Sequence, residues 1–175
     1  MHRHKRQHSK GKPDGHATSA IEPQAKFEVA PLPAGHDLAI GFFGASGTVT
    51  GSRYLLDDGR TRLLVDCGLF QGGRELRNLN WAPPPPELNG VDTILLTHAH
   101  LDHSGAIPRL VRNGWKGRVI ATRATAELCE LLLPDSGHLQ EKDAQFANRR
   151  GYSRHRPALP LYTQNDALNA LEHFQ

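Results

Sequence analysis

The run from Thr97 to His103 reads Thr-His-Ala-His-Leu-Asp-His and places three imidazoles and a carboxylate within six residues. Residues 92–97 before it are mainly apolar and bounded by polar residues, which predicts a buried β-strand. A helical pattern begins just after the run. Ligand-type side chains this dense on a strand-to-helix loop indicate a transition-metal site, and one that holds two ions.

The spacing explains how the ligands would divide. In an extended segment, side chains at i and i+2 point the same way, so His98 and His100 can converge on one ion. Asp102 and His103 lie where the chain turns and can reach a neighbouring position. Imidazole nitrogen and carboxylate oxygen suit zinc, with manganese or iron as alternatives. The competing interpretation, a polar loop of surface or helix-capping histidines, would suit a lone histidine better than four ligand-type residues.

The surrounding pattern alternates between strands and helices, which predicts an α+β protein with α/β-type layers. A hairpin turn at Asp57-Asp58-Gly59 joins two of the strands. Four consecutive prolines, Pro83–Pro86, predict an extended link. The predicted strands are residues 38–43, 52–56, 62–65, 91–97 and 118–121; the predicted helices are residues 71–79, 105–111 (ended by Asn113-Gly114) and 124–133 (ended by Pro134).

A glycine-rich turn covers residues 44–51. Its glycine spacing matches neither the P-loop nor the dinucleotide fingerprint, and no lysine follows it. It is therefore interpreted as a tight loop lying beside the metal site.

Composition and charge place the chain among globular proteins of one domain, with 175 residues, 38% of them hydrophobic. Residues 1–12 carry five basic and no acidic side chains, and residues 1–37 hold few large apolar ones, which predicts a disordered basic, His-rich tail. The chain shows no apolar run of membrane-spanning length and no secretory h-region, so the predicted location is cytoplasmic with no membrane partner. Cys67 and Cys129 are predicted to be two small buried residues.

Several segments together resemble one known family. The sequence is similar to the N-terminal portion of metallo-β-lactamase-fold hydrolases, and specifically to their β-CASP branch of RNA-processing nucleases. The histidine run indicates only the superfamily, whereas the Val-Thr-Gly-Ser, Asp-Cys-Gly and Asp-Ser elements narrow it to that branch. The matching segments are residues 44–52, 64–72, 96–105, 121–125, 133–136 and 161–163.

The resemblance implies the N-terminal part of an αββα sandwich and cleavage of RNA phosphodiester bonds by a metal-bound hydroxide. It assigns His98 and His100 to the first zinc, and Asp102 and His103 to the second, with manganese as the other candidate metal. Asp102 would also orient or deprotonate the attacking water, and Asp66 would support the metal-binding loop. Asp135-Ser136 is left open between a functional role and a helix-stop turn.

The family also has elements that this sequence lacks: a further metal-binding histidine, a bridging aspartate and the inserted β-CASP domain. Residues 38–175 are therefore predicted to be the N-terminal part of a metallo-β-lactamase domain, truncated before the later ligands and weak or inactive alone. Predicted partners are RNA and either a homodimer mate or a complementing C-terminal portion. The alternatives are a hydrolase of thioesters or lactones, or a non-catalytic fragment that needs a partner.

Overall fold

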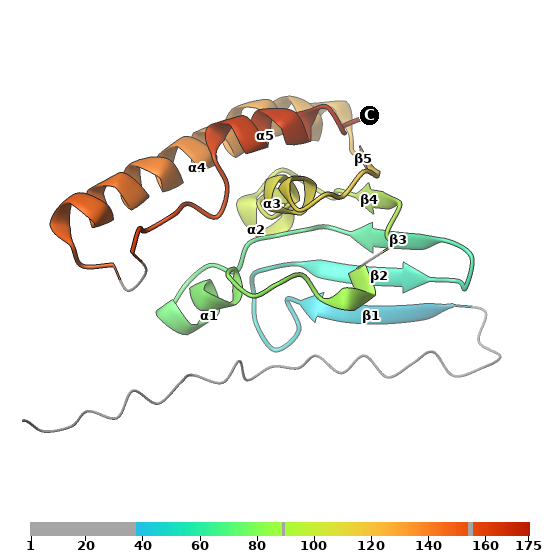
Figure 1. Ribbon diagram of the computed structural model, residues 1–175. Helices are drawn as coiled ribbons and strands as arrows, with labels where there is room; N and C mark the ends of the chain where they lie inside the picture. The colour runs from blue at the N-terminus through green and yellow to red at the C-terminus, as the bar shows by residue number, and fades with distance from the viewer. Residues whose placement is uncertain (1–37, 89, 154–155) are drawn as a thin grey trace, which may run out of the picture.

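The computed structural model describes residues 38–88, 90–153 and 156–175, so the predicted tail lies outside the described residues. The described ranges form one mixed sheet with helices layered against it (Figure 1). The strands are β1 (Ala39–Gly44), β2 (Arg53–Asp57), β3 (Arg62–Val65), β4 (Thr93–Leu95) and β5 (Arg118–Ile120). The helices are α1 (Arg74–Leu79), the 3₁₀ turn η1 (Pro86–Leu88), α2 (Leu101–Ser104), α3 (Ile107–Arg112), α4 (Arg123–Arg150) and α5 (Gln164–Leu171).

The sheet order follows the chain, β1-β2-β3-β4-β5. The first three strands are antiparallel and the last three are parallel. The predicted hairpin between β2 and β3 is confirmed. Its turn is held by the Asp57 carboxylate, which accepts hydrogen bonds from Gly59 N at 2.8 Å and Arg62 Nε at 2.7 Å.

One face of the sheet carries the core. Leu55, Leu64, Ile94 and Val119 are paired in register across four adjacent strands, and none exposes more than 4% of its surface. Because side chains alternate along a strand, these four point to the same face. They join a single hydrophobic cluster with side chains of α3, α4 and α5. The α+β layering predicted from the sequence is therefore confirmed.

The opposite face is apolar but uncovered by the described residues. Phe42, Tyr54, Val65, Leu95 and Ile120 form the neighbouring register row, and Phe42, Leu95 and Ile120 are 53%, 40% and 37% exposed. We call this surface the open face. Its composition resembles a core more than a solvated sheet surface.

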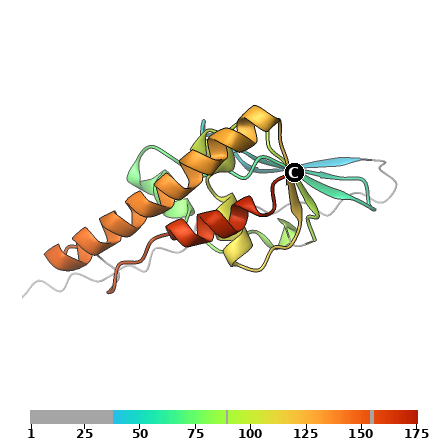
Figure 2. The same cartoon turned by 90° about the horizontal axis from the view of Figure 1, so that it is seen from above.

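The helix α4 differs from its prediction, because it runs through Pro134 instead of ending there. Proline in a helix removes one hydrogen bond and costs about 3 kcal/mol. Pro134 is itself buried, and α5 packs against α4 close to this position (Figure 2). Gly137 packs so closely that a Cβ would lie 2.7 Å from Gln164 N, and Tyr162 Oη donates to Ser136 Oγ at 2.8 Å. Asp135-Ser136 thus lies inside a helix, and the helix-stop interpretation was wrong.

Two other local expectations are corrected. The helix predicted over residues 105–111 is present as α3, with Pro108 in its first turn, but the short helix α2, which Gly105 caps, precedes it inside the histidine run, where only a turn was expected. The four prolines are not uniformly extended, because Pro86 already begins η1. Helix α5 was missed, although Thr163 and Asp166 form a capping box, which is a signal visible in sequence.

Two further observations test predictions about the cysteines and about membrane-spanning segments. Cys67 and Cys129 are free thiols with 3% and 0% exposure, which confirms the prediction for both. Within the described ranges, no helix has the length and apolar character needed to cross a bilayer.

Candidate metal centre

The histidine run leaves the sheet where β4 ends and enters α2 at Leu101. The loop between them turns His98 and His100 toward each other, with His98 Nε2 and His100 Nδ1 3.2 Å apart. Two nitrogens bound to one tetrahedral zinc at 2.0–2.1 Å would be about 3.3–3.4 Å apart. The observed 3.2 Å is also the distance of a hydrogen bond between the two rings, so the assignment of this pair to one ion stays a prediction.

Asp102 and His103 form a second pair in the first turn of α2. His103 Nε2 lies 3.6 Å from Asp102 Oδ2. The rings of His98 and His103 are 3.9 Å apart between centroids, so the two pairs are adjacent. The structure thus brings together all four residues predicted from the sequence, although Asp102 and His103 lie in a helix and not in an irregular turn.

Asp66 lies beneath the pairs with 2% exposure, and its carboxylate is heavily hydrogen-bonded. Oδ2 lies 2.7 Å from His103 Nδ1 and accepts from Ser52 Oγ at 3.0 Å. Oδ1 accepts from both the backbone N and the Oγ1 of Thr97 at 2.8 Å. A carboxylate only accepts hydrogen bonds, so this contact places a ring proton of His103 on Nδ1 and turns Nε2 away from Asp66.

The backbone of Asp66 is unusual as well, with φ +60° in the left-handed region. Aspartate and asparagine tolerate this region better than other residues that have a side chain. The conformation ends β3 and turns the carboxylate toward His103. The acidic residue here therefore serves the backbone and the site together.

Backbone contacts lock the loop after Asp66 against α2. Cys67 N donates to His103 O at 2.7 Å, and Leu69 N donates to Leu101 O at 2.9 Å. Between them Gly68 passes so close that a Cβ would lie 1.7 Å from the carbonyl oxygen of Asp102. Only glycine permits this approach, which explains the residue after Cys67.

Sequence reasoning missed two supporting residues, Ser52 and Thr97, which both donate to Asp66. Ser52 follows the glycine-rich turn, and its backbone N also donates to Asp102 O at 2.9 Å. The turn therefore ends beside the site, as predicted. The available signals were the hydroxyl of Ser52 after the glycine-rich turn and that of Thr97 after a strand. Neither signal indicates which side chain the hydroxyl would bond to.

The donor set is incomplete for a closed metal site. Across the described ranges, no three His, Cys, Asp or Glu side chains are arranged to hold one ion together. The four ligand-type side chains instead form two pairs, and Asp66 is already bonded to one member.

Fold and site together define an α+β domain that presents a histidine-rich loop at the end of a parallel strand. The family profile described as "Metallo-beta-lactamase superfamily" matches residues 46–158, and the chain belongs to this superfamily. The fold expected from the resemblance is thereby confirmed for this part of the sandwich.

Curated relatives include proteins named as ribonucleases and as a transcription termination factor, in keeping with the predicted branch of RNA-processing nucleases. Ribonuclease TTHA0252 of Thermus thermophilus is 53% identical over 94 residues, which are 54% of this chain and 21% of that protein. Transcription termination factor FttA of Methanocaldococcus jannaschii is 32% identical over 62% of this chain and 17% of its own length. Probable RNase MJ4 of the same organism is 30% identical over 75% of this chain and 27% of its own length.

The match therefore spans less than a third of each of these relatives. Among solved structures, a motif mutant of a metallo-β-lactamase from Cronobacter sakazakii is similar at 30% identity and a TM-score of 0.37. The aligned region covers 51% of this chain and 34% of the chain in that structure.

Proposed function

We propose that this chain carries the metal-binding loop of an RNA-cleaving hydrolase of the β-CASP type. The observation that supports this most directly is the convergence of His98, His100, Asp102 and His103 above a buried, hydrogen-bonded Asp66. The relatives named ribonucleases support RNA as the substrate.

The residues fit zinc by donor chemistry. His98 and His100 would hold one ion, and Asp102 with His103 would hold a second, with manganese as the alternative. A bound divalent metal supplies Lewis acidity toward a phosphoryl oxygen and lowers the pKa of water. The contact between Asp66 and His103 is a carboxylate–histidine pair of the kind that orients metal ligands.

The protein side chains would divide the remaining work. Asp102 is 21% exposed at its side chain, so it can reach solvent and accept the proton of the attacking water. The water oxygen forms a bond to phosphorus as the phosphodiester P–O bond to the leaving oxygen breaks. Asp66 does not contact substrate in this scheme; it keeps the His103 ring in one orientation and one tautomer.

The chain by itself is proposed to be a weak or inactive nuclease. A catalytic zinc site takes three protein ligands, whereas each pair here offers two. The remaining ligands would come from a complementing C-terminal portion, in keeping with the greater length of the relatives. A non-catalytic fragment that acts only with its partner is consistent with the same two pairs.

Metal content tests the binding half of the proposal. The full chain, loaded with zinc and then dialysed to remove unbound metal, should retain zinc when measured by plasma emission. His98→Ala combined with His100→Ala should lower the zinc content sharply. His138→Ala, an exposed histidine on α4, is the matched control and should change nothing. The basic His-rich tail is present in all three proteins, so it cannot produce the difference. Unchanged zinc in the double variant would refute the assignment.

Cleavage of a 5′-labelled single-stranded RNA with zinc or manganese tests the activity, beside His100→Ala. Little cleavage is expected from the chain alone. Robust cleavage that His100→Ala abolishes would show that the chain is already a competent enzyme. Metal-dependent hydrolysis of thioester or lactone substrates, with no action on RNA in the presence of a complementing portion, would favour the other branch of the superfamily.

A further inference from the structure

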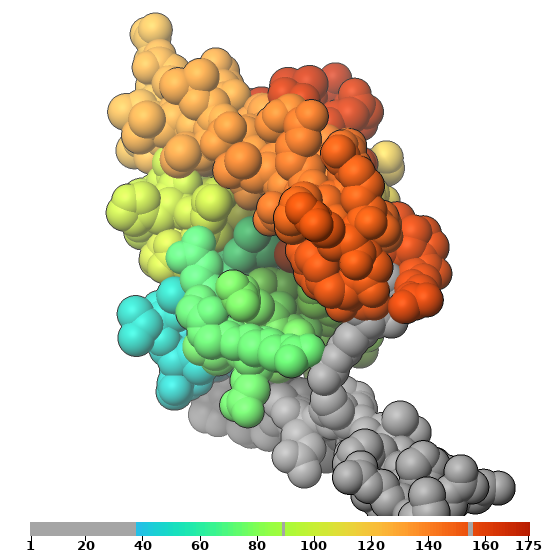
Figure 3. Space-filling model, turned by 90° about the vertical axis from the view of Figure 1, so that its left-hand side faces the viewer, coloured from blue at the N-terminus to red at the C-terminus, as the bar shows by residue number. Residues whose placement is uncertain are grey.

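A groove of about 660 Å³ lies between α1 and α4. It opens between the green segment that contains α1 and the orange segment that contains α4 (Figure 3). We call it the α1–α4 groove. The residues on its walls that carry the argument are Gln71, Arg74, Arg77, Trp81, Asp143 and Tyr152.

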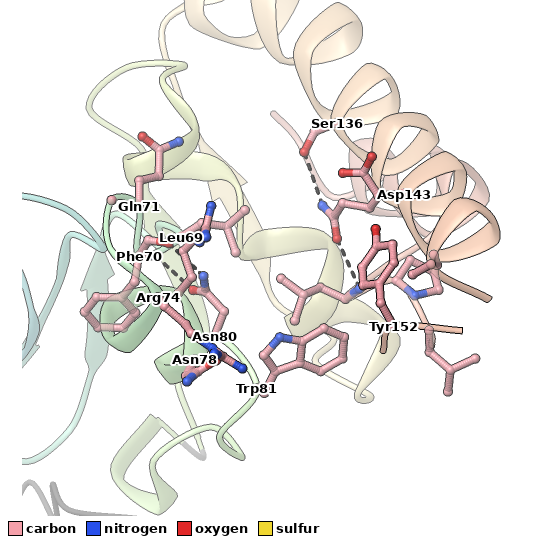
Figure 4. A pocket seen from close by; sticks show the side chains of 18 residues that line it. Leu69, Phe70, Gln71, Arg74, Asn78, Asn80, Trp81, Ser136, Asp143 and Tyr152 are labelled. Atoms are coloured by element: carbon pink, nitrogen blue, oxygen red, sulfur yellow. Dashed lines mark hydrogen bonds between the residues drawn. The ribbon is translucent and has the colours of Figure 1, made fainter. Parts of the chain in front are cut away.

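Two aromatic side chains stand on opposite walls of the groove, Trp81 from the segment after α1 and Tyr152 from the segment after α4 (Figure 4). They are 49% and 65% exposed. Single exposed aromatics are common, but two that line one concave surface provide flat apolar area on both sides of an opening. This arrangement suits a flat ligand that can stack.

The backbone that carries Trp81 is held firmly. Arg109 donates to the carbonyl oxygens of Asn80 and Trp81. The Asn80 side chain is buried and makes two hydrogen bonds to the backbone of Phe70, at 2.8 and 2.7 Å. The exposed indole is therefore attached to a fixed support, so little backbone order has to be gained when a ligand binds.

The side chains in the lining that carry a charge at neutral pH are Arg74, Arg77 and Asp143. Arg74 and Arg77 are exposed and three residues apart on α1, so they lie on one side of the helix. Guanidinium groups bind phosphate by paired hydrogen bonds. With the carboxylate of Asp143, the net charge of the groove lining is +1. The exposed amides of Gln71 and Asn78 can form hydrogen bonds to base edges.

The groove adjoins the metal centre through a single loop. Leu69 lines the groove, and its backbone N donates to Leu101 O at the start of α2. Leu69 follows Asp66 by three residues, a span of at most about 10 Å of chain. A short single strand could therefore contact the groove and the histidine loop at once.

We infer that the α1–α4 groove is a subsite for single-stranded RNA, where Trp81 and Tyr152 stack on bases and Arg74 and Arg77 bind the adjoining phosphates. The inference rests on the proposed function for its choice of ligand, and adds where the strand is held outside the metal centre. Aromatic stacking combined with guanidinium contacts is the usual mode by which proteins hold single strands without reading their sequence.

The test is binding of a labelled oligouridine of about ten nucleotides, followed by fluorescence anisotropy in EDTA, where no metal chemistry contributes. The full chain should bind, and Trp81→Ala and Tyr152→Ala should each raise Kd about tenfold, since stacking of one base contributes about that factor. Trp81→Phe should keep most of the affinity because it retains a ring. Phe42→Ala is the matched control, as Phe42 is similarly exposed on the open face.

Two further readouts separate stacking from charge. RNA should quench tryptophan emission in the wild type but not in Trp81→Phe, whose remaining Trp115 lies outside the groove lining. Arg74→Ala with Arg77→Ala should lower the slope of log K against log salt by about 1.4, at about 0.7 for each single-strand phosphate contact. Arg60→Ala, in the β2–β3 turn, should leave the slope unchanged.

The outcomes distinguish this inference from the proposed function. If Trp81→Ala and Tyr152→Ala bind RNA as tightly as the wild type, the groove is not the RNA subsite. The proposal of metal-dependent cleavage would not be affected by that result. The absence of any binding to the wild type would overturn the groove as well. Loss of affinity in these variants, together with no RNA cleavage even when a complementing C-terminal portion is added, would uphold the groove as a binding site and refute the proposed activity.

Discussion

The two faces of the same sheet differ sharply although both are built from apolar residues. On the covered face, Leu64, Ile94 and Val119 are completely buried under the helices. On the open face, Phe42, Leu95 and Ile120 are between 37% and 53% exposed. The strands are the same, so the difference lies in what covers them. A sheet whose two faces are equally apolar is suited to a position between two layers, and the described part of this chain supplies one.

The largest expected effect comes from a pair of neighbours on opposite faces. Ile94→Ala should lower the free energy of unfolding by about 2–5 kcal/mol, because it leaves a cavity in a closed core. Leu95→Ala should lower it by less than about 1 kcal/mol, since Leu95 is 40% exposed. Urea unfolding of both variants measures the difference. Equal losses would show that the open face is covered in solution.

The second-largest effect is expected at alkaline pH, which should lower the free energy of unfolding through groups buried on the covered side. Burial raises the pKa of Tyr162 to about 12, that of Cys129 to about 11, and that of Cys67 above its usual value. These groups stay neutral in the folded state while the unfolded chain ionises, so stability is complete below about pH 9 and falls as pH rises toward 12.

Tyr162 alone should account for about 2 kcal/mol by pH 12. Tyr162→Phe should therefore flatten the dependence of unfolding free energy on pH between 10 and 12. Tyr152→Phe, on an exposed tyrosine, serves as the control and should follow the wild type. A slope that Tyr162→Phe does not alter would contradict the burial of the phenol.

A smaller change is expected on the open face. Ile40→Thr with Phe42→Thr keeps residues that suit a strand while removing exposed apolar area. The variant should bind less hydrophobic dye and self-associate less by sedimentation velocity, with a change in stability of about 1 kcal/mol or less. A loss as large as that of Ile94→Ala would mean that these side chains are packed.

The smallest effect is predicted for deletion of residues 1–37. Those residues have few apolar side chains to bury, and each ordered residue costs about 1–2 kcal/mol of backbone entropy. Their removal should leave the thermal midpoint nearly unchanged by calorimetry. A marked decrease would indicate that the segment docks on the rest of the chain, with the open face as the first place to look.

The strands show how far sequence patterns reach. Alternation and turn residues located all five strands of the described sheet and the hairpin at Asp57-Asp58-Gly59, because both signals are local. The same patterns made the predicted strand over residues 91–97 too long, because the observed strand β4 is only Thr93–Leu95. Strand ends depend on where hydrogen-bonding partners stop, and that is not a local property.

The helices show where those patterns fail. Pro134 predicts a helix end by a sound local rule, yet α4 continues to Arg150. Its continuation depends on Gly137, Ser136 and Tyr162, whose contacts join segments more than twenty residues apart. A propensity rule applied to neighbouring residues cannot register such contacts.

The candidate centre divides in the same way. The identity and spacing of His98, His100, Asp102 and His103 were sufficient to predict paired donors, because these residues are adjacent in the chain. Only the tertiary structure decided that Ser52 and Thr97 both donate to Asp66, and that Asp66 in turn meets His103 across 37 residues. The sequence by itself thus determined which chemistry the loop can offer, since donor type and local spacing are written in consecutive residues. The fold decided what holds that loop in place and which sheet face stays open, because both depend on segments that meet only after the chain has folded.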